Sequence, residues 1–139
     1  MTDKEKIAYL KRYSTLMREF DHKWSLIEEL RAKQGKITAS YGPQAGAGGG
    51  SIYNNRDADL IIKIVDLRGD ALETLNEALD AREEISQVID QLDPDEWPRI
   101  VCEARYLYGW KWDRVADSLE FCPGYIQKLH RQALAQLEV

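Results

Sequence analysis

Apolar residues recur every three or four positions along the first third of the chain. These residues are Leu10, Tyr13, Met17, Phe20, Trp24 and Ile27. The spacing places them on one stripe of an α-helix, so a single helix is predicted from Asp3 to about Gln34. Thr2 or Asp3 is suited to cap its start, and Gly35 is suited to end it.

This pattern stops at residues 35–54, where the sequence is GKITASYGPQAGAGGGSIYN. Glycine loses more backbone entropy than any other residue when it is ordered, which predicts a flexible linker between two helices. A phosphate-binding loop would need Gly-Lys-Ser or Gly-Lys-Thr after the glycines and a buried strand before them. The segment has neither feature, and a linker is therefore favoured over a nucleotide site.

A second helical period starts near Asp57 and continues to Leu92. Its apolar positions are Leu60, Ile61, Ile64, Val65, Leu67, Ala71, Leu72, Leu75, Ala78, Leu79, Ile85, Val88, Ile89 and Leu92. This stripe is broader than the seam of a two-stranded coiled coil, which indicates contact with more than one neighbour. We expect residues 1–93 to form an antiparallel hairpin of two long helices that also associates as a homodimer, the commonest way to bury such a surface.

Three shorter helices are predicted in residues 94–139, which makes the predicted fold class all-α. They are Glu96–Tyr108, Trp112–Leu119 and Pro123–Leu137. Asp95 is suited to cap the first of them, because Pro98 is tolerated only in a first turn. Gly109 can take the left-handed conformation that ends this helix. The other two are joined by the three-residue turn Glu120–Cys122, and a short helix, a tight turn and a longer helix together form the helix-turn-helix plan.

The last predicted helix carries most of the candidate DNA contacts. The candidate DNA-binding residues are Lys111, Arg114, Tyr125, Gln127, Lys128, His130 and Arg131. If this helix enters the major groove, Gln127 and Lys128 come within reach of base edges. Arg114 and Arg131 are expected to contact phosphates. Spacing alone also allows a small helical bundle whose last helix is merely a polar surface.

The same segment resembles region 4 of bacterial sigma factors. The resemblance is carried by Ala104-Arg105-Tyr106-Leu107, Gly109, Trp112, Val115-Ala116, Leu119, Ile126 and Leu129-His130-Arg131-Gln132-Ala133-Leu134. It is closer still to small phage regulators of Gram-positive bacteria related to the ArpU and RinA late-gene regulators. In one such group a region-4-like tail follows two long helices joined by a variable loop. The resemblance implies sequence-specific binding of double-stranded DNA, control of phage or prophage transcription, and a possible contact with RNA polymerase.

Some positions depart from the region-4 pattern. Region 4 usually has Ser or Thr as the caps of its second and third helices, where this chain has Lys111 and Cys122. Pro123 and Gly124 stand where family members often carry base-reading side chains. Fewer base contacts than in region 4, or a target other than the usual promoter element, are therefore expected.

The net charge and the cysteine content further narrow the classes of protein to which the chain can belong. The formal net charge of −5 argues against nonspecific coating of nucleic acid or of an anionic membrane. Residues 55–93 hold four Lys/Arg against eleven Asp/Glu, so the second long helix has an acidic face. Cys102 and Cys122 show neither the spacing of a zinc site nor that of a disulfide framework, and reduced thiols are expected.

The chain offers little sign of catalysis, metal binding or membrane association. No apolar run approaches the ~20 residues that a membrane span needs, and the N-terminus lacks the apolar core of a signal peptide. A cytoplasmic location is therefore expected. His22 has no second ligand one turn away, and no Ser/His/Asp set or paired carboxylates stand out, so neither a cofactor nor an enzymatic activity is expected.

Two alternatives to a transcription regulator stay open. The first is a protein-interaction adaptor, in which the sigma-like tail binds polymerase or another regulator with little affinity for DNA. The second is a small-terminase-like subunit for DNA packaging, because such proteins also combine a helix-turn-helix with oligomerising helices.

Overall fold

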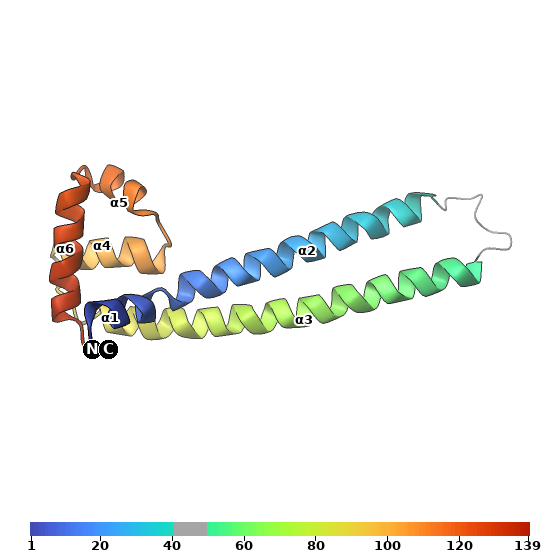
Figure 1. Ribbon diagram of the computed structural model, residues 1–139, viewed down its shortest axis with the longest axis horizontal. Coiled ribbons are helices and arrows are strands. Elements are labelled where there is room, and N and C mark those ends of the chain that lie inside the picture. The colour runs from blue at the N-terminus through green and yellow to red at the C-terminus, as the bar shows by residue number, and fades with distance from the viewer. Residues whose placement is uncertain (41–49) are drawn as a thin grey trace. The chain divides into compact units, whose positions relative to one another are not determined.

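The computed structural model describes the backbone of residues 1–40 and 50–139 and the side chains of residues 1–34 and 57–139. Within these ranges every regular element is helical, which confirms the all-α prediction (Figure 1). The elements are α1 (Asp3–Leu10), α2 (Arg12–Ser40), α3 (Gly50–Ile89), α4 (Trp97–Cys102), the π-helical η2 (Glu103–Leu107), α5 (Trp112–Leu119) and α6 (Pro123–Gln136). The chain divides into two compact units, residues 18–75 and residues 1–17 together with 76–139.

The first predicted helix is in fact two helices that meet at Lys11, and the prediction of one helix was wrong. Thr2 caps α1 as predicted: its Oγ1 accepts from the Glu5 N–H at 3.3 Å, and the Glu5 carboxylate accepts from the Thr2 N–H at 3.0 Å. At the break, Nε of Arg12 donates to the Tyr9 carbonyl at 3.1 Å. In a continuous helix that carbonyl would accept from the N–H four residues later. The side chain therefore competes with the helical hydrogen bond, a recognised cause of kinks.

The two long helices extend further into the glycine-rich region than predicted. α2 continues past Gly35 to Ser40, and α3 already begins at Gly50. A glycine inside a helix costs only about 1 kcal/mol relative to alanine, so one glycine need not end it. Of the predicted linker, residues 41–49 lie outside the described residues.

Residues 18–75 have a small core of their own. Ile27 from α2 is buried with Ile64 and Ala71 from α3. The partly buried residues around them are Phe20, Trp24, Leu30, Leu60 and Leu67. In addition, Nζ of Lys23 on α2 donates to Oγ1 of Thr74 on α3 at 2.9 Å. The apolar stripes predicted for the two long helices thus meet in this unit.

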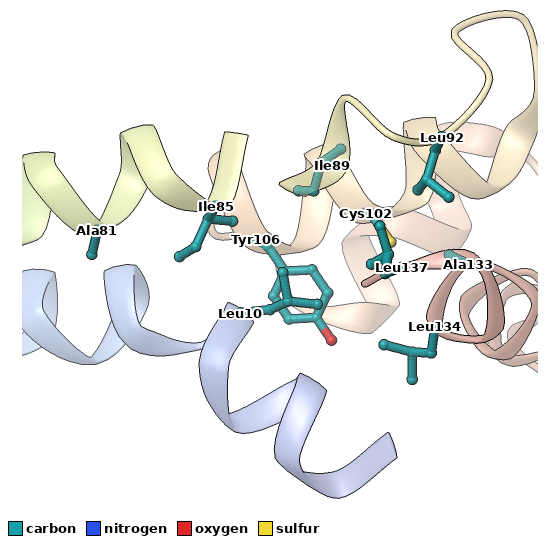
Figure 2. Packing of buried hydrophobic residues seen from close by; sticks show 10 residues of the cluster. All are labelled: Leu10, Ala81, Ile85, Ile89, Leu92, Cys102, Tyr106, Ala133, Leu134 and Leu137. Atoms are coloured by element: carbon teal, nitrogen blue, oxygen red, sulfur yellow. The ribbon is translucent and has the colours of Figure 1, made fainter. Parts of the chain in front are cut away.

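A second core lies in the unit made of residues 1–17 and 76–139, and it connects α1, the end of α3, α4, η2 and α6. Its buried members are Leu10, Ala81, Ile85, Ile89, Leu92, Cys102, Tyr106, Ala133, Leu134 and Leu137 (Figure 2). Polar contacts support the same packing: Nζ of Lys6 donates to the Leu134 carbonyl at 2.7 Å. The Gln91 side-chain amide makes two hydrogen bonds to the Glu138 backbone, at 2.8 and 3.0 Å.

The helix predicted as Glu96–Tyr108 is divided into α4 and the π-helical η2, and its start differs by one residue from the prediction. Glu96, not Asp95, occupies the cap position, and Pro98 lies in the first turn as expected. Asp95 is instead part of a turn in which its N–H donates to the Asp93 carboxylate at 2.9 Å. From α4, the Arg99 guanidinium reaches back to the Leu92 carbonyl at 3.1 Å. This contact ties α4 to the segment that follows α3.

Candidate nucleic-acid interface

α5 and α6 are joined by a tight turn whose geometry comes from two backbone features. α5 has the predicted bounds, Trp112–Leu119, and α6 begins at Pro123. Glu120 takes the left-handed conformation, with φ of 60°. The Phe121 N–H then donates to the Ala116 carbonyl at 3.1 Å, a bond typical of a Schellman helix end. The turn therefore ends α5 abruptly and redirects the chain within three residues.

A dedicated core holds α4, α5 and α6 together. Its buried residues are Val101, Ala104, Val115, Ala116, Ile126 and Leu129, and the partly buried residues against it are Trp110, Trp112, Leu119 and Phe121. Ala116 lies beside the tight turn, where a small side chain lets the two helices approach closely. α6 packs against both α4 and α5, and Figure 1 shows it lying crosswise to α4. The core thus fixes the direction of α6.

α6 has one buried face and one exposed, basic face. The buried residues are Ile126, Leu129, His130, Ala133 and Leu134. Gln127, Lys128 and Arg131 are exposed, as predicted, and their spacing places them on the opposite side of the helix. The helix contains no acidic residue. Its outer face therefore offers hydrogen-bond donors without a carboxylate to repel phosphate.

Two further cations lie at the start of α5. Lys111 and Arg114 are both exposed. The Arg114 guanidinium lies 4.3 Å from the centre of the Trp110 ring, a cation–π contact that orients the side chain. Among the ion pairs of the described residues, none uses Lys111, Arg114, Lys128 or Arg131. These four cations are therefore available to an anionic ligand.

His130 does not belong to this surface, and its assignment as a DNA contact was wrong. The side chain is only 5% exposed, and its Nε2 lies 2.6 Å from the Tyr106 hydroxyl. The Trp112 ring packs edge-on against it, with ring centres 4.7 Å apart. Burial, followed by the nearby Arg105 charge, lowers the pKa of His130 to about 4. Burial also raises the pKa of Tyr106, so both groups are neutral at pH 7 and the hydroxyl can donate to Nε2.

Tyr125 is exposed as predicted, but it also takes part in an aromatic cluster. Its ring contacts Phe121 edge-on with centres 4.8 Å apart, and Phe121 contacts Trp97 in the same way at 5.1 Å. Trp97 is exposed as well. Tyr125 therefore lies at the boundary between the basic face of α6 and an aromatic surface.

Two residues that sequence reasoning did not assign support the arrangement. Arg105 donates to the Trp110 carbonyl at 3.0 Å, and its guanidinium lies 4.8 Å from the centre of the Trp112 ring. It fixes the segment that leads into α5. Glu120 is the residue of the turn that takes the left-handed conformation. Glycine or asparagine usually occupies such a position, so the sequence did not indicate this role for a glutamate.

Both cysteines are free, as expected: Cys102 is buried and Cys122 is exposed. Burial raises the pKa of the Cys102 thiol to about 12, so that it is inert at neutral pH. Where the structure describes the chain, no group of three or more His, Cys, Asp or Glu side chains is placed to hold a metal ion. Within the same residues, no helix is both long and apolar enough to cross a bilayer.

The chain was also compared with proteins of known family or structure. Scans against protein-family models, curated proteins and solved structures each found no match.

Proposed function

We propose that residues 94–139 form a helix-turn-helix domain that binds double-stranded DNA, and that the protein is a sequence-specific transcription regulator of the phage or prophage type. One observation carries the proposal: α6 follows α5 across a three-residue turn and combines a buried apolar face with an exposed, acid-free face. A helix held in this way can enter the major groove, where it meets both phosphates and base edges. The resemblance to sigma region 4 adds the transcriptional role.

The exposed side chains divide into two kinds by their place on the domain. Gln127 and Lys128 lie near the start of α6, where base edges come within reach, and we assign them to sequence readout. Arg131, one turn further along, and Arg114 and Lys111 on the supporting helix are assigned to phosphates. The net charge of −5 makes these few cations the main source of affinity.

The long helices complete the proposal. In it, α2 and α3 form an antiparallel hairpin, and the chain associates as a homodimer that presents two helix-turn-helix domains to a cytoplasmic DNA target. Contact with RNA polymerase is a further part of the proposed role.

The test uses the full chain and DNA that the chain itself selects from a random pool. Gln127→Ala or Lys128→Ala should weaken the binding free energy by about 1–3 kcal/mol on the selected sequence and by little on random DNA, because each substitution removes base contacts. Arg131→Ala or Arg114→Ala should weaken binding to all sequences alike. Each should also lower the slope of the logarithm of the binding constant against the logarithm of the salt concentration by about one unit. Lys4→Ala, at an exposed lysine of α1, is the matched control and should change neither quantity.

Affinity that is unchanged in Gln127→Ala, Lys128→Ala and Arg131→Ala together would contradict the proposal. The proposal would also be contradicted if the chain selected no preferred sequence from the random pool. An adaptor role would then take its place, and the exposed aromatic rings of Trp97 and Tyr125 are the observation that favours it. Large aromatic side chains of this kind are enriched in protein–protein interfaces.

A further inference from the structure

α3 carries a second apolar seam that no part of the described chain covers. Its positions are Ile62, Val65, Gly69, Leu72, Asn76 and Leu79, and they are separated by three and four residues in strict alternation. Ile62 is 57%, Val65 60%, Leu72 49% and Leu79 51% exposed. All six positions belong to the single helix α3; the first four lie in the unit of residues 18–75, and Asn76 and Leu79 follow directly in the helix.

The seam is distinct from the face of α3 that is already buried. Ile64, Ala71, Ala78 and Ile85 are buried and repeat every seven residues. At about 100° per residue they point to the side of the helix opposite the exposed seam. α3 therefore has two heptad seams, and only the inner one has neighbours in the described part of the same chain. A surface helix with one partner normally shows a single such stripe.

We propose that this outer seam packs against the same seam of a second copy, as a parallel two-stranded coiled coil. The proposal rests on the homodimer proposed above and specifies its interface and orientation. Leu72, Leu79 and Val65 occupy the d positions of the heptad, and Ile62 occupies an a position. Apolar residues at a and d positions drive two helices to supercoil, and here all three d positions and one of the three a positions are apolar.

The charges that flank the seam select the parallel orientation. One flank, at the e positions, holds Asp66, Glu73 and Asp80, and all three are exposed. In an antiparallel pair the e positions of the two helices face each other, and these acids would repel. In a parallel pair each e position faces a g position instead, which brings Arg68 of one copy beside Glu73 of the other. The parallel dimer replaces the repulsion with two favourable pairs.

The polar and small residues of the seam point to the same arrangement. Asn76 is exposed and occupies an a position, where a single asparagine fixes register and favours two strands at some cost in stability. In a parallel, in-register pair the two asparagines meet and can hydrogen-bond to each other. At Gly69, an added Cβ would meet nothing within 4 Å in the single chain, so the space in front of the seam is open there.

The first test compares two exposed leucines in the same unit of the protein. Leu72→Glu should raise the dimer dissociation constant by roughly a hundredfold in analytical ultracentrifugation, because one buried leucine is lost from each copy. Leu26→Glu makes the same change on α2, outside the seam, and should leave the dimer intact. Both side chains are exposed in the single chain, and circular dichroism should show unchanged helix content for both variants.

A second test addresses orientation. Leu79→Cys in a Cys122→Ser background should form an intermolecular disulfide readily. In a parallel pair residue 79 of one copy lies opposite residue 79 of the other, close enough for a disulfide to form between them. Leu26→Cys in the same background is the control and should cross-link slowly.

These measurements need no DNA, so they separate this inference from the proposed DNA binding. A dimer that persists in Leu72→Glu would overturn the seam and leave the homodimer standing. A wild-type monomer at micromolar concentration would overturn both. A dimer that is broken by Leu72→Glu, but that forms no disulfide in the Leu79→Cys variant, would overturn the parallel orientation.

Discussion

α6 and the middle of α3 differ in where their large apolar side chains lie. On α6, Ile126, Leu129 and Leu134 are buried within a single copy of the chain. On α3, Ile62 and Leu72 are largely exposed. Removal of apolar surface from water is the main favourable contribution to folding and to association. The burial of apolar side chains on α6 therefore already stabilises the single chain. The exposed apolar side chains of α3 can still contribute to association with a partner.

The largest effect should come from breaking the packing around α6. Ile126→Ala should lower the free energy of unfolding by about 2–5 kcal/mol, because it leaves a cavity in a well-packed core. Leu72→Ala, on the exposed seam of α3, is the comparison and should cost no more than about 0.5 kcal/mol in the dissociated chain, as is usual for surface positions. Urea denaturation of both variants at low protein concentration measures this, and similar losses would contradict the distinction between the two regions.

The second largest effect should be a dependence of stability on pH, and we expect it to come from the α6 region and not from the middle of α3. In the folded state the pKa of His130 is about 4, below its ordinary value of 6.5, because the ring is buried. The unfolded state therefore binds the proton more readily. The stability contributed by the neutral ring is complete above about pH 6.5 and is lost as the pH falls toward 4.

Thermal unfolding of the wild type and of His130→Phe between pH 7 and pH 4 measures this dependence. The wild type should lose stability more steeply than the variant, whose ring cannot take up a proton. Parallel curves would show that the protonation of His130 is not linked to folding.

A smaller loss is expected when the partner of His130 is removed. Tyr106→Phe should destabilise the protein by about 1–3 kcal/mol, since Nε2 of the buried imidazole then lacks its 2.6 Å hydrogen bond. Tyr108→Phe makes the same change at an exposed ring two residues away and should have almost no effect. Equal stability of the two variants in chemical denaturation would argue that the hydrogen bond adds nothing to the packing.

The smallest expected effect is a gain in stability at the turn before α6. Glu120→Gly should stabilise the protein by about 1 kcal/mol, because a left-handed backbone strains any residue with a Cβ. Asp117→Gly, three residues earlier on the exposed side of α5, should instead destabilise by about 0.5–1 kcal/mol. A loss of stability in both variants would show that the turn is not strained in solution.

The sequence by itself determined the elements whose signals are local. The period of apolar residues, together with Pro123 and the three residues before it, placed α5 and the start of α6 correctly. Gly109 takes the left-handed conformation, with φ of 72°, as its lack of a Cβ allows. The exposure of Gln127 and Arg131 also followed from their place in the period. Such features depend on residues a few positions apart, and the printed sequence contains all of the interactions that decide them.

Only the tertiary structure decided the features that depend on distant partners. His130 is a polar residue at a buried position, and the hydroxyl that makes its burial tolerable belongs to Tyr106, 24 residues earlier in the chain. The burial of Ile64 but not of Ile62 likewise depends on which side of α3 meets α2. The broad stripe in the sequence contains both seams of α3, and spacing cannot tell which of them has a neighbour. That choice is made when helices pack, because apolar side chains are equally suited to any apolar surface and only the final geometry decides which ones leave water.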